Sequence, residues 1–88
     1  MIYQVVYTRA AVKQLKKMDR KIAALIISFI EDKLLYCENP RAYGKALQGN
    51  LSNIWRYRIG DYRVLAKIQD QILVITVVEV GHRKNIYE

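Results

Sequence analysis

The sequence has little cysteine, proline and histidine and no long hydrophobic run, and these shortages exclude several classes of protein. Cys37 is the single cysteine among 88 residues, which excludes a disulfide framework and a cysteine-based zinc site. A reducing, cytoplasmic location is therefore expected. The longest apolar stretch, residues 22–30, contains Ser28 and is far shorter than the ~20 residues that cross a bilayer. The N-terminus does not resemble a signal peptide, so we expect no contact with a membrane.

Acidic side chains are also scarce. Eight Asp and Glu residues stand against fifteen Lys and Arg residues, which gives a net charge of +7 and a pI near 9.7. The excess is spread over the chain, since residues 1–40 carry seven basic and four acidic side chains and residues 41–88 carry eight and four. This balance favours a polyanionic partner, either nucleic acid or an acidic protein segment. Because 52% of the residues are hydrophobic, we expect one small folded domain over residues 1–88.

The first half of the chain predicts one strand and two helices. Residues 2–7 are β-branched and aromatic, as is typical of a strand, and Thr8 and Asp19 are candidate helix N-caps. The apolar side chains after the second cap recur with helical spacing, at Ile22, Leu25, Ile26, Phe29, Ile30 and Leu34. Asn39 and Pro40 should end this helix, because the residue before a proline avoids the α region.

The second half predicts a loop and three strands. Residues 39–53 hold the only proline and two of the four glycines, and we interpret them as a loop. Strands are then predicted over residues 54–59, 62–69 and 72–80. The resulting β-α-α-β-β-β order predicts an α+β fold, in which a helical hairpin packs on one face of a mostly antiparallel sheet.

The segment WRYRIGDYR, residues 55–63, predicts a β-hairpin that turns at Gly60-Asp61. Arg58 then lies directly opposite Arg63, although like charges at such positions destabilise a hairpin by about 0.2–1 kcal/mol. A bound phosphate would offset this repulsion, because guanidinium groups bind phosphate oxygens in pairs. A phosphate-binding patch is therefore favoured over the alternative, an ordinary solvated face.

Alternation along the predicted strands sorts their side chains into two faces. The face that the helices should cover holds Trp55, Tyr57, Ile59, Tyr62, Val64, Ala66 and Ile68. The opposite, open face holds Arg56, Arg58, Arg63 and Lys67, with Leu65 among them. If Gln69 pairs with Ile72, apolar walls come from Val78 beside Arg63 and Val74 beside Lys67.

The C-terminal segment GHRKNIYE, residues 81–88, is a second concentration of polar side chains. It contains His82, Arg83, Lys84 and Tyr87 directly after the last predicted strand. These groups could converge on the arginine patch, since the strand ends near the same sheet. The alternative is a solvated, frayed C-terminus.

Three motifs together resemble the RelE/ParE superfamily of bacterial and archaeal toxins, in particular its RelE branch. They are the LQG element, the segment WRYRIGDYR and the segment VGHRKNIY, in the order and spacing of that superfamily. The resemblance implies a toxin of a type II toxin–antitoxin system that cleaves mRNA in the ribosomal A site. It also implies binding to rRNA and mRNA, neutralisation by an acidic cognate antitoxin, and a toxin–antitoxin complex that reaches operator DNA through the antitoxin.

By position, the resemblance assigns catalytic roles to Arg56, Arg58, Arg63, Arg83 and Tyr87. We add Lys67, His82 and Lys84 as substrate-binding candidates. Studied relatives carry lysines at the positions of Arg56 and Arg58, and an arginine cannot act as a base.

The implied reaction is attack of the RNA 2′-OH on the adjacent phosphate, which yields a 2′,3′-cyclic phosphate and a 5′-OH. Tyr87 is the candidate base because nearby guanidinium groups favour its phenolate form. The three hairpin arginines would stabilise the phosphorane, and Arg83 would assist the leaving group with His82 as a competing proton donor. No metal or cofactor is expected. Two alternatives remain open: a ParE-like toxin that poisons DNA gyrase, and a nucleic-acid-binding module without catalysis.

Overall fold

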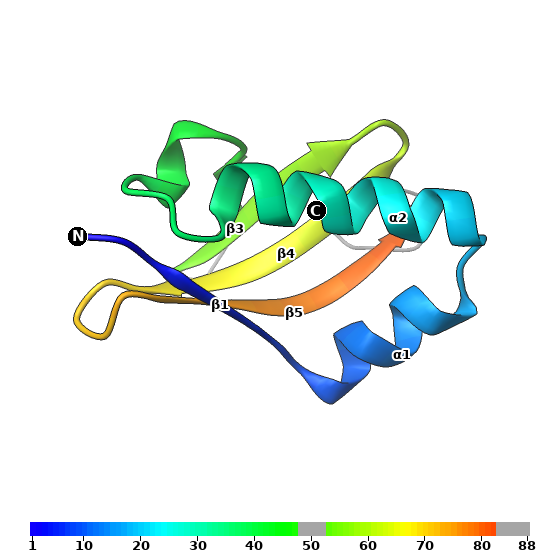
Figure 1. Ribbon diagram of the computed structural model, residues 1–88, viewed down its shortest axis with the longest axis horizontal. Coiled ribbons are helices and arrows are strands. Elements are labelled where there is room, and N and C mark those ends of the chain that lie inside the picture. The colour runs from blue at the N-terminus through cyan, green and yellow to red at the C-terminus, as the bar shows by residue number, and fades with distance from the viewer. Residues whose placement is uncertain (48–52, 83–88) are drawn as a thin grey trace.

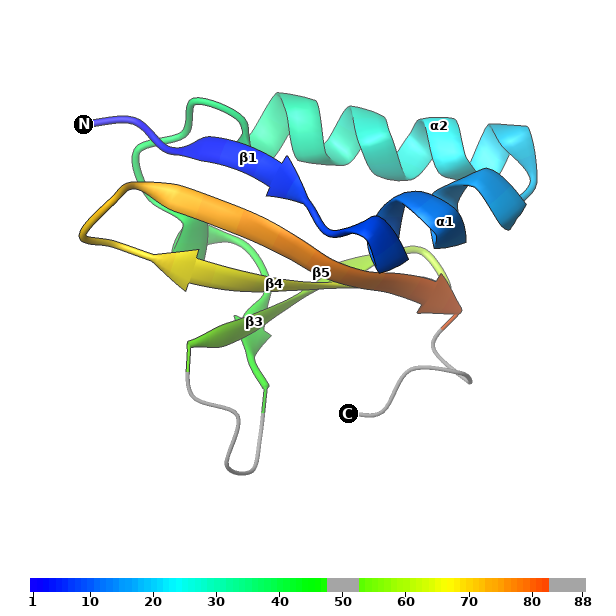
Figure 2. The same ribbon diagram turned by 90° about the horizontal axis from the view of Figure 1, so that it is seen from below.

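The computed structural model describes residues 1–47 and 53–82 of the chain. Two helices lie on one face of a mixed sheet (Figure 1), and the view from below shows both on the same side of the strands (Figure 2). The described elements are β1 (Gln4–Tyr7), α1 (Arg9–Lys17), α2 (Arg20–Phe29), the π-helical turn η1 (Ile30–Leu34), the 3-10 helix η2 (Pro40–Ala42), β2 (Lys45–Ala46), β3 (Ile54–Ile59), β4 (Tyr62–Gln69) and β5 (Val74–His82). Over these residues, no helix is both long enough and apolar enough to span a membrane.

The described strands form one sheet in the order β1-β5-β4-β3-β2. β1 runs parallel to β5, and the other neighbouring strands are antiparallel. The predicted α+β class and the mostly antiparallel sheet are confirmed. The prediction missed β2, which lies inside the expected loop over residues 39–53, because a strand of two residues has too few positions to show alternation.

Both predicted helix starts are confirmed, and each cap binds a backbone amide. The Thr8 hydroxyl oxygen accepts a hydrogen bond from Ala11 N at 3.1 Å. The Asp19 carboxylate accepts one from Lys21 N at 2.7 Å. These bonds satisfy amides that have no partner within the first turn of a helix.

The end of the second helix differs from the prediction. Helical structure ends at Leu34, before the predicted stop at Asn39-Pro40, and Tyr36 takes a positive φ of 63°. The reason is tertiary: Tyr36 N donates to Tyr3 O, and Tyr3 N donates to Cys37 O, both at 2.9 Å. These bonds to the N-terminal segment turn the chain before the proline is reached.

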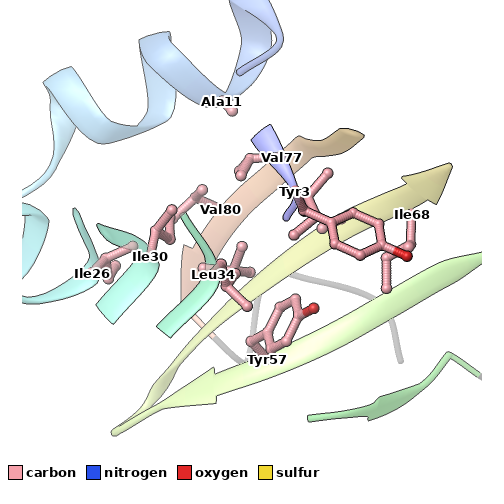
Figure 3. Close-up of a cluster of buried hydrophobic side chains, with 12 residues drawn as sticks. Tyr3, Ala11, Ile26, Ile30, Leu34, Tyr57, Ile68, Val77 and Val80 are labelled. Carbon is pink, nitrogen blue, oxygen red and sulfur yellow. The ribbon is translucent and has the colours of Figure 1, made fainter. Parts of the chain in front are cut away.

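The core lies between the helices and one face of the sheet (Figure 3). Ile26, Ile30 and Leu34 on the helical side are fully buried, as is Tyr57 on β3. Burial of each such apolar side chain contributes about 1.5–3 kcal/mol. The predicted helix-covered face is confirmed, since all of its members belong to the core cluster or pack against it: Trp55, Tyr57, Ile59, Tyr62, Val64, Ala66 and Ile68.

The pairing of β4 with β5 differs from the prediction. Gln69 pairs with Val74 instead of Ile72, because residues 70–73 form a wider turn in which Leu73 has a positive φ of 55°. A β-bulge between Leu65 and Ala66 shifts the register again. Arg63 therefore lies opposite Gly81 instead of beside Val78, and Lys67 lies opposite Thr76 instead of Val74.

The wider turn is held by a cluster of polar side chains around Asp70. Arg41 donates two hydrogen bonds to the Asp70 carboxylate, each at 3.0 Å, and the Tyr3 hydroxyl donates a third at 2.6 Å. These bonds, first that from Arg41 and then that from Tyr3, lower the pKa of Asp70 to about 2. The cluster joins the N-terminus, the segment after α2 and the β4–β5 turn.

The lowered pKa of Asp70 predicts how stability changes in acid. The ordinary carboxyl pKa of 3.8 applies to the unfolded chain, so the ionised group contributes its full stabilisation above that pH. The contribution is lost as the pH falls through about 2, the folded-state value. Asp70→Asn should therefore lower the free energy of unfolding near neutral pH and flatten its decline below pH 4.

Urea unfolding at a series of pH values, followed by circular dichroism, measures this difference. Asp61→Asn is the matched control, because Asp61 is an exposed carboxylate in the other hairpin turn. If the free energy of unfolding changes with pH in the same way for Asp70→Asn and for the original chain, the cluster does not stabilise the fold through this charge.

Candidate functional site

The β3–β4 hairpin has the register that the sequence predicts. Arg58 pairs with Arg63 and Tyr57 with Val64, on either side of a turn at Gly60, which has a positive φ of 59°. Directly opposite residues of an antiparallel pair have Cβ atoms about 4.5–5.5 Å apart. Two arginine side chains therefore leave the sheet side by side, on the face turned away from both helices.

We define the arginine face as Arg56, Arg58, Arg63 and Lys67, which share this side of β3 and β4. The structure brings these predicted residues together. Arg58 and Lys67 are exposed and Arg56 is half-buried. Arg63, however, is only 1% exposed, which corrects the expectation of a fully open patch.

Arg63 lies in the middle of the sheet. β4 is the central strand, so Arg63 lies between Arg58 on β3 and Gly81 on β5. Electrostatic attraction is stronger where water is excluded, so a buried guanidinium attracts an anion more strongly than an exposed one. Arg63 thus forms the base of the arginine face, and the exposed Arg58 forms its outer part.

The border of the arginine face is partly apolar. Leu47 and Leu65 are buried on this side of the sheet and pack with Ile54. Together with Val78 and Glu79 they line a hollow of about 250 Å³. Val74 lies opposite Gln69 and not opposite Lys67, so it stays on this face but at another position than predicted, and β5 also contributes a carboxylate, Glu79, opposite Leu65.

The structure does not bring His82 to the arginine face. His82 pairs with Tyr62, whose side chain lies on the helix-covered side. The two rings pack edge to face, with their centres 5.2 Å apart. The other C-terminal candidates, Arg83, Lys84 and Tyr87, lie outside the described residues. Within residues 1–47 and 53–82, His, Cys, Asp and Glu side chains form no group of three that could hold a metal ion.

A second hollow, which the sequence did not reveal, adjoins the arginine face. It measures about 340 Å³ and is lined by Phe29, Tyr43, Gly44, Lys45, Arg56 and Arg58. Tyr43 lies within residues 39–53, the segment that the sequence predicts as a loop. The glycine was the only local signal, since Gly44 has a positive φ of 75° and a Cβ there would lie 2.2 Å from the Arg56 carbonyl oxygen.

Comparison with known proteins agrees with this architecture. Residues 5–87 match the family described as ParE toxin of type II toxin–antitoxin system, parDE. Toxin RelE of Mycobacterium tuberculosis is 33% identical over 97% of this chain and 86% of its own length. Toxin RelG of the same organism is 32% identical over 99% of this chain and 98% of its own length.

A solved structure supports the same assignment. The toxin–antitoxin complex RelBE2 from M. tuberculosis contains a chain that superposes with a TM-score of 0.83 at 29% identity, covering 97% of this chain and 95% of that one. The resemblance inferred from the hairpin and its flanking motifs is therefore confirmed. From the family match over residues 5–87 and these relatives, we conclude that the chain belongs to the ParE toxin family of type II toxin–antitoxin systems.

Proposed function

We propose that this toxin is a ribosome-dependent endoribonuclease that cleaves mRNA in the ribosomal A site. The observation that carries the proposal is the pair Arg58 and Arg63, opposite each other on one sheet face with Arg56 beside them. The similarity to RelE and RelG toxins, each about a third identical over nearly the whole chain, supports it. Such a substrate implies a cytoplasmic protein.

In the proposed reaction the RNA supplies its own nucleophile. The 2′-OH attacks the adjacent phosphorus, the bond to the 5′-oxygen breaks, and a 2′,3′-cyclic phosphate forms. Negative charge builds up on the non-bridging oxygens of the phosphorane, where Arg58 and Arg63 would bind it and Arg56 would assist. Lys67, farther along β4, would bind a neighbouring phosphate of the RNA.

Proton transfer needs other groups, because a guanidinium stays protonated. We propose Tyr87 as the base and Arg83 as the residue that stabilises the leaving 5′-oxygen, with Lys84 as a further contact to the RNA backbone. His82 lies on the opposite side of the sheet, so we give it no proton-transfer role. In this scheme Tyr87 accepts the proton of the 2′-OH, and the leaving 5′-oxygen, stabilised by Arg83, takes its proton from water. The proposed reaction uses no metal ion or cofactor.

The second candidate function is poisoning of DNA gyrase, because the matching family is described as ParE toxin. The fold does not separate the two, since function depends on the site and not on the architecture. The arginine face favours RNA cleavage, because three guanidinium groups on adjacent strands suit a phosphorane.

We propose that the partner is an acidic antitoxin, by analogy with the toxin–antitoxin complex RelBE2. The net charge of +7 favours fast association with an acidic segment. The apolar border formed by Leu47, Ile54 and Leu65 offers a contact for apolar side chains of the same segment. Operator DNA would be bound through the antitoxin.

Expression of the chain without an antitoxin should stop growth by blocking translation. Pulse labelling is expected to show protein synthesis falling before DNA synthesis. The reverse order, with DNA breaks that depend on gyrase, would contradict mRNA cleavage and support the ParE-like function.

Arg58→Ala should slow cleavage of mRNA on programmed ribosomes by about 10²–10³-fold, the loss typical of one removed oxyanion donor. Because Arg58 is exposed and faces another arginine, its removal should not lower the melting temperature. Single-turnover cleavage and thermal melting, measured in parallel, test both statements. Arg63→Met should slow cleavage as strongly, and it keeps much of the buried side-chain volume.

Arg20→Ala is the matched control, since Arg20 is an exposed arginine at the start of α2 on the helical side. It should cleave at the original rate. Normal cleavage by the Arg58 and Arg63 variants would exclude the arginine face as the catalytic site.

Arg58→Glu should weaken binding of the cognate antitoxin, because it places a negative charge where an acidic segment is expected to dock. Isothermal titration calorimetry with the purified antitoxin measures the change, and Arg20→Glu controls for net charge. Equal affinities for the two variants would place the antitoxin on another surface.

A further inference from the structure

The hollow at the β2–β3 edge combines aromatic and cationic walls. The aromatic residues Phe29 and Tyr43 and the cations Lys45, Arg56 and Arg58 line about 340 Å³ of open space. The segment that follows α2, green in Figure 1, passes beside β3 and so brings the aromatic and cationic groups together. This volume is near the lower limit for pockets that bind small molecules.

Tyr43 is 40% exposed, yet its position is defined by contacts on several sides. Its carbonyl oxygen accepts a hydrogen bond from Trp55 Nε1 at 2.5 Å. The rings of Phe29 and Tyr43 pack edge to face, with their centres 6.3 Å apart. Lys33 Nζ lies 5.6 Å from the centre of the Tyr43 ring. An aromatic ring held in this way loses little freedom when a ligand stacks on it.

Gly44 brings this segment against the neighbouring strand. Any side chain at Gly44 would collide with the Arg56 carbonyl oxygen, so the glycine permits the close approach to β3. Lys45 pairs with Arg56 and therefore lies on the same side of the sheet as the arginine face. The hollow is continuous with that face, because Arg56 and Arg58 belong to both.

We propose that this hollow binds a nucleotide next to the scissile phosphate. The base lies against Tyr43, and the phosphate of the same nucleotide lies near Lys45 and Arg58. This assignment rests on the function proposed above, because it places the hollow along the path of the RNA substrate. It adds a binding group, Tyr43, that takes no part in the chemical steps.

The chemistry of the lining favours a nucleotide over an acidic peptide. The described residues that line the hollow include three cations and no carboxylate, so the occupant carries negative charge. A planar aromatic side chain beside cations is the combination with which proteins bind single-stranded RNA, by stacking on the base and pairing with the phosphate. An acidic peptide would use the cations and leave the ring without a planar partner.

The test compares two anionic oligomers of equal charge. A short 2′-O-methyl oligouridylate cannot be cleaved, and its counterpart without bases retains every phosphate. The full-length chain should bind the oligomer with bases roughly tenfold more tightly, as expected for a base stacked on an aromatic ring. Tyr43→Ala should abolish this preference, whereas Tyr43→Phe, which keeps the ring, should retain it.

Two further variants distinguish base stacking from charge and from the loss of a tyrosine elsewhere in the protein. Lys45→Ala should weaken binding of both oligomers by the same factor and reduce the dependence of affinity on salt. Tyr36→Ala should change neither affinity, since Tyr36 is an exposed tyrosine outside the hollow. An unchanged preference for bases in Tyr43→Ala would overturn the proposal.

Ribosomal cleavage by the same variants distinguishes this proposal from the enzymatic one. If the preference depends on Tyr43 but the original chain cleaves no mRNA, the nucleotide site stands and the proposed endoribonuclease activity is wrong. If mRNA is cleaved but the preference does not depend on Tyr43, the activity stands and the nucleotide site is wrong. If Tyr43→Ala weakens binding of the antitoxin but keeps the preference for the oligomer with bases, the hollow binds the antitoxin instead.

Discussion

The antiparallel register between β3 and β4 positions both the core and the cationic face. Opposite residues share a face of a sheet, so one register places Tyr57 and Val64 in the core and Arg58 and Arg63 on the other side. A slip of one residue would turn the arginines into the apolar core. The same ladder of hydrogen bonds therefore stabilises the fold and positions the cationic site.

The two faces have opposite energetic effects. The helix-covered face is apolar and well packed, with Ile26, Ile30 and Leu34 on one side and Tyr57 on the other, all fully buried. The arginine face holds like charges side by side, which opposes folding. Burial on the first face offsets repulsion on the second. The electrostatic cost can then be recovered when an anion, whether RNA or an acidic protein segment, binds there.

The segment between α2 and β3 connects the core to the site. The Tyr57 hydroxyl donates to the Pro40 carbonyl at 2.6 Å, and burial raises the pKa of this phenol, so it remains a donor. Arg41 binds Asp70 across the sheet end, and its guanidinium also lies over the Trp55 ring, 5.9 Å from its centre. With its neighbours anchored in this way, Tyr43 is held at the edge of the arginine face.

Features that depend on neighbouring residues could be predicted from the amino-acid sequence. Thr8 and Asp19 cap helices that begin directly after them, and alternation with the Gly60 turn places Arg58 opposite Arg63. Features that depend on residues far apart in the chain became visible only in the folded structure. Contacts with Tyr3 end the second helix early, contacts around Asp70 accompany the wider β4–β5 turn, and Arg63 is almost fully buried although it lies on the face away from the helices. Local patterns carry information about a residue and its near neighbours, whereas these outcomes arise from residues far apart in the chain.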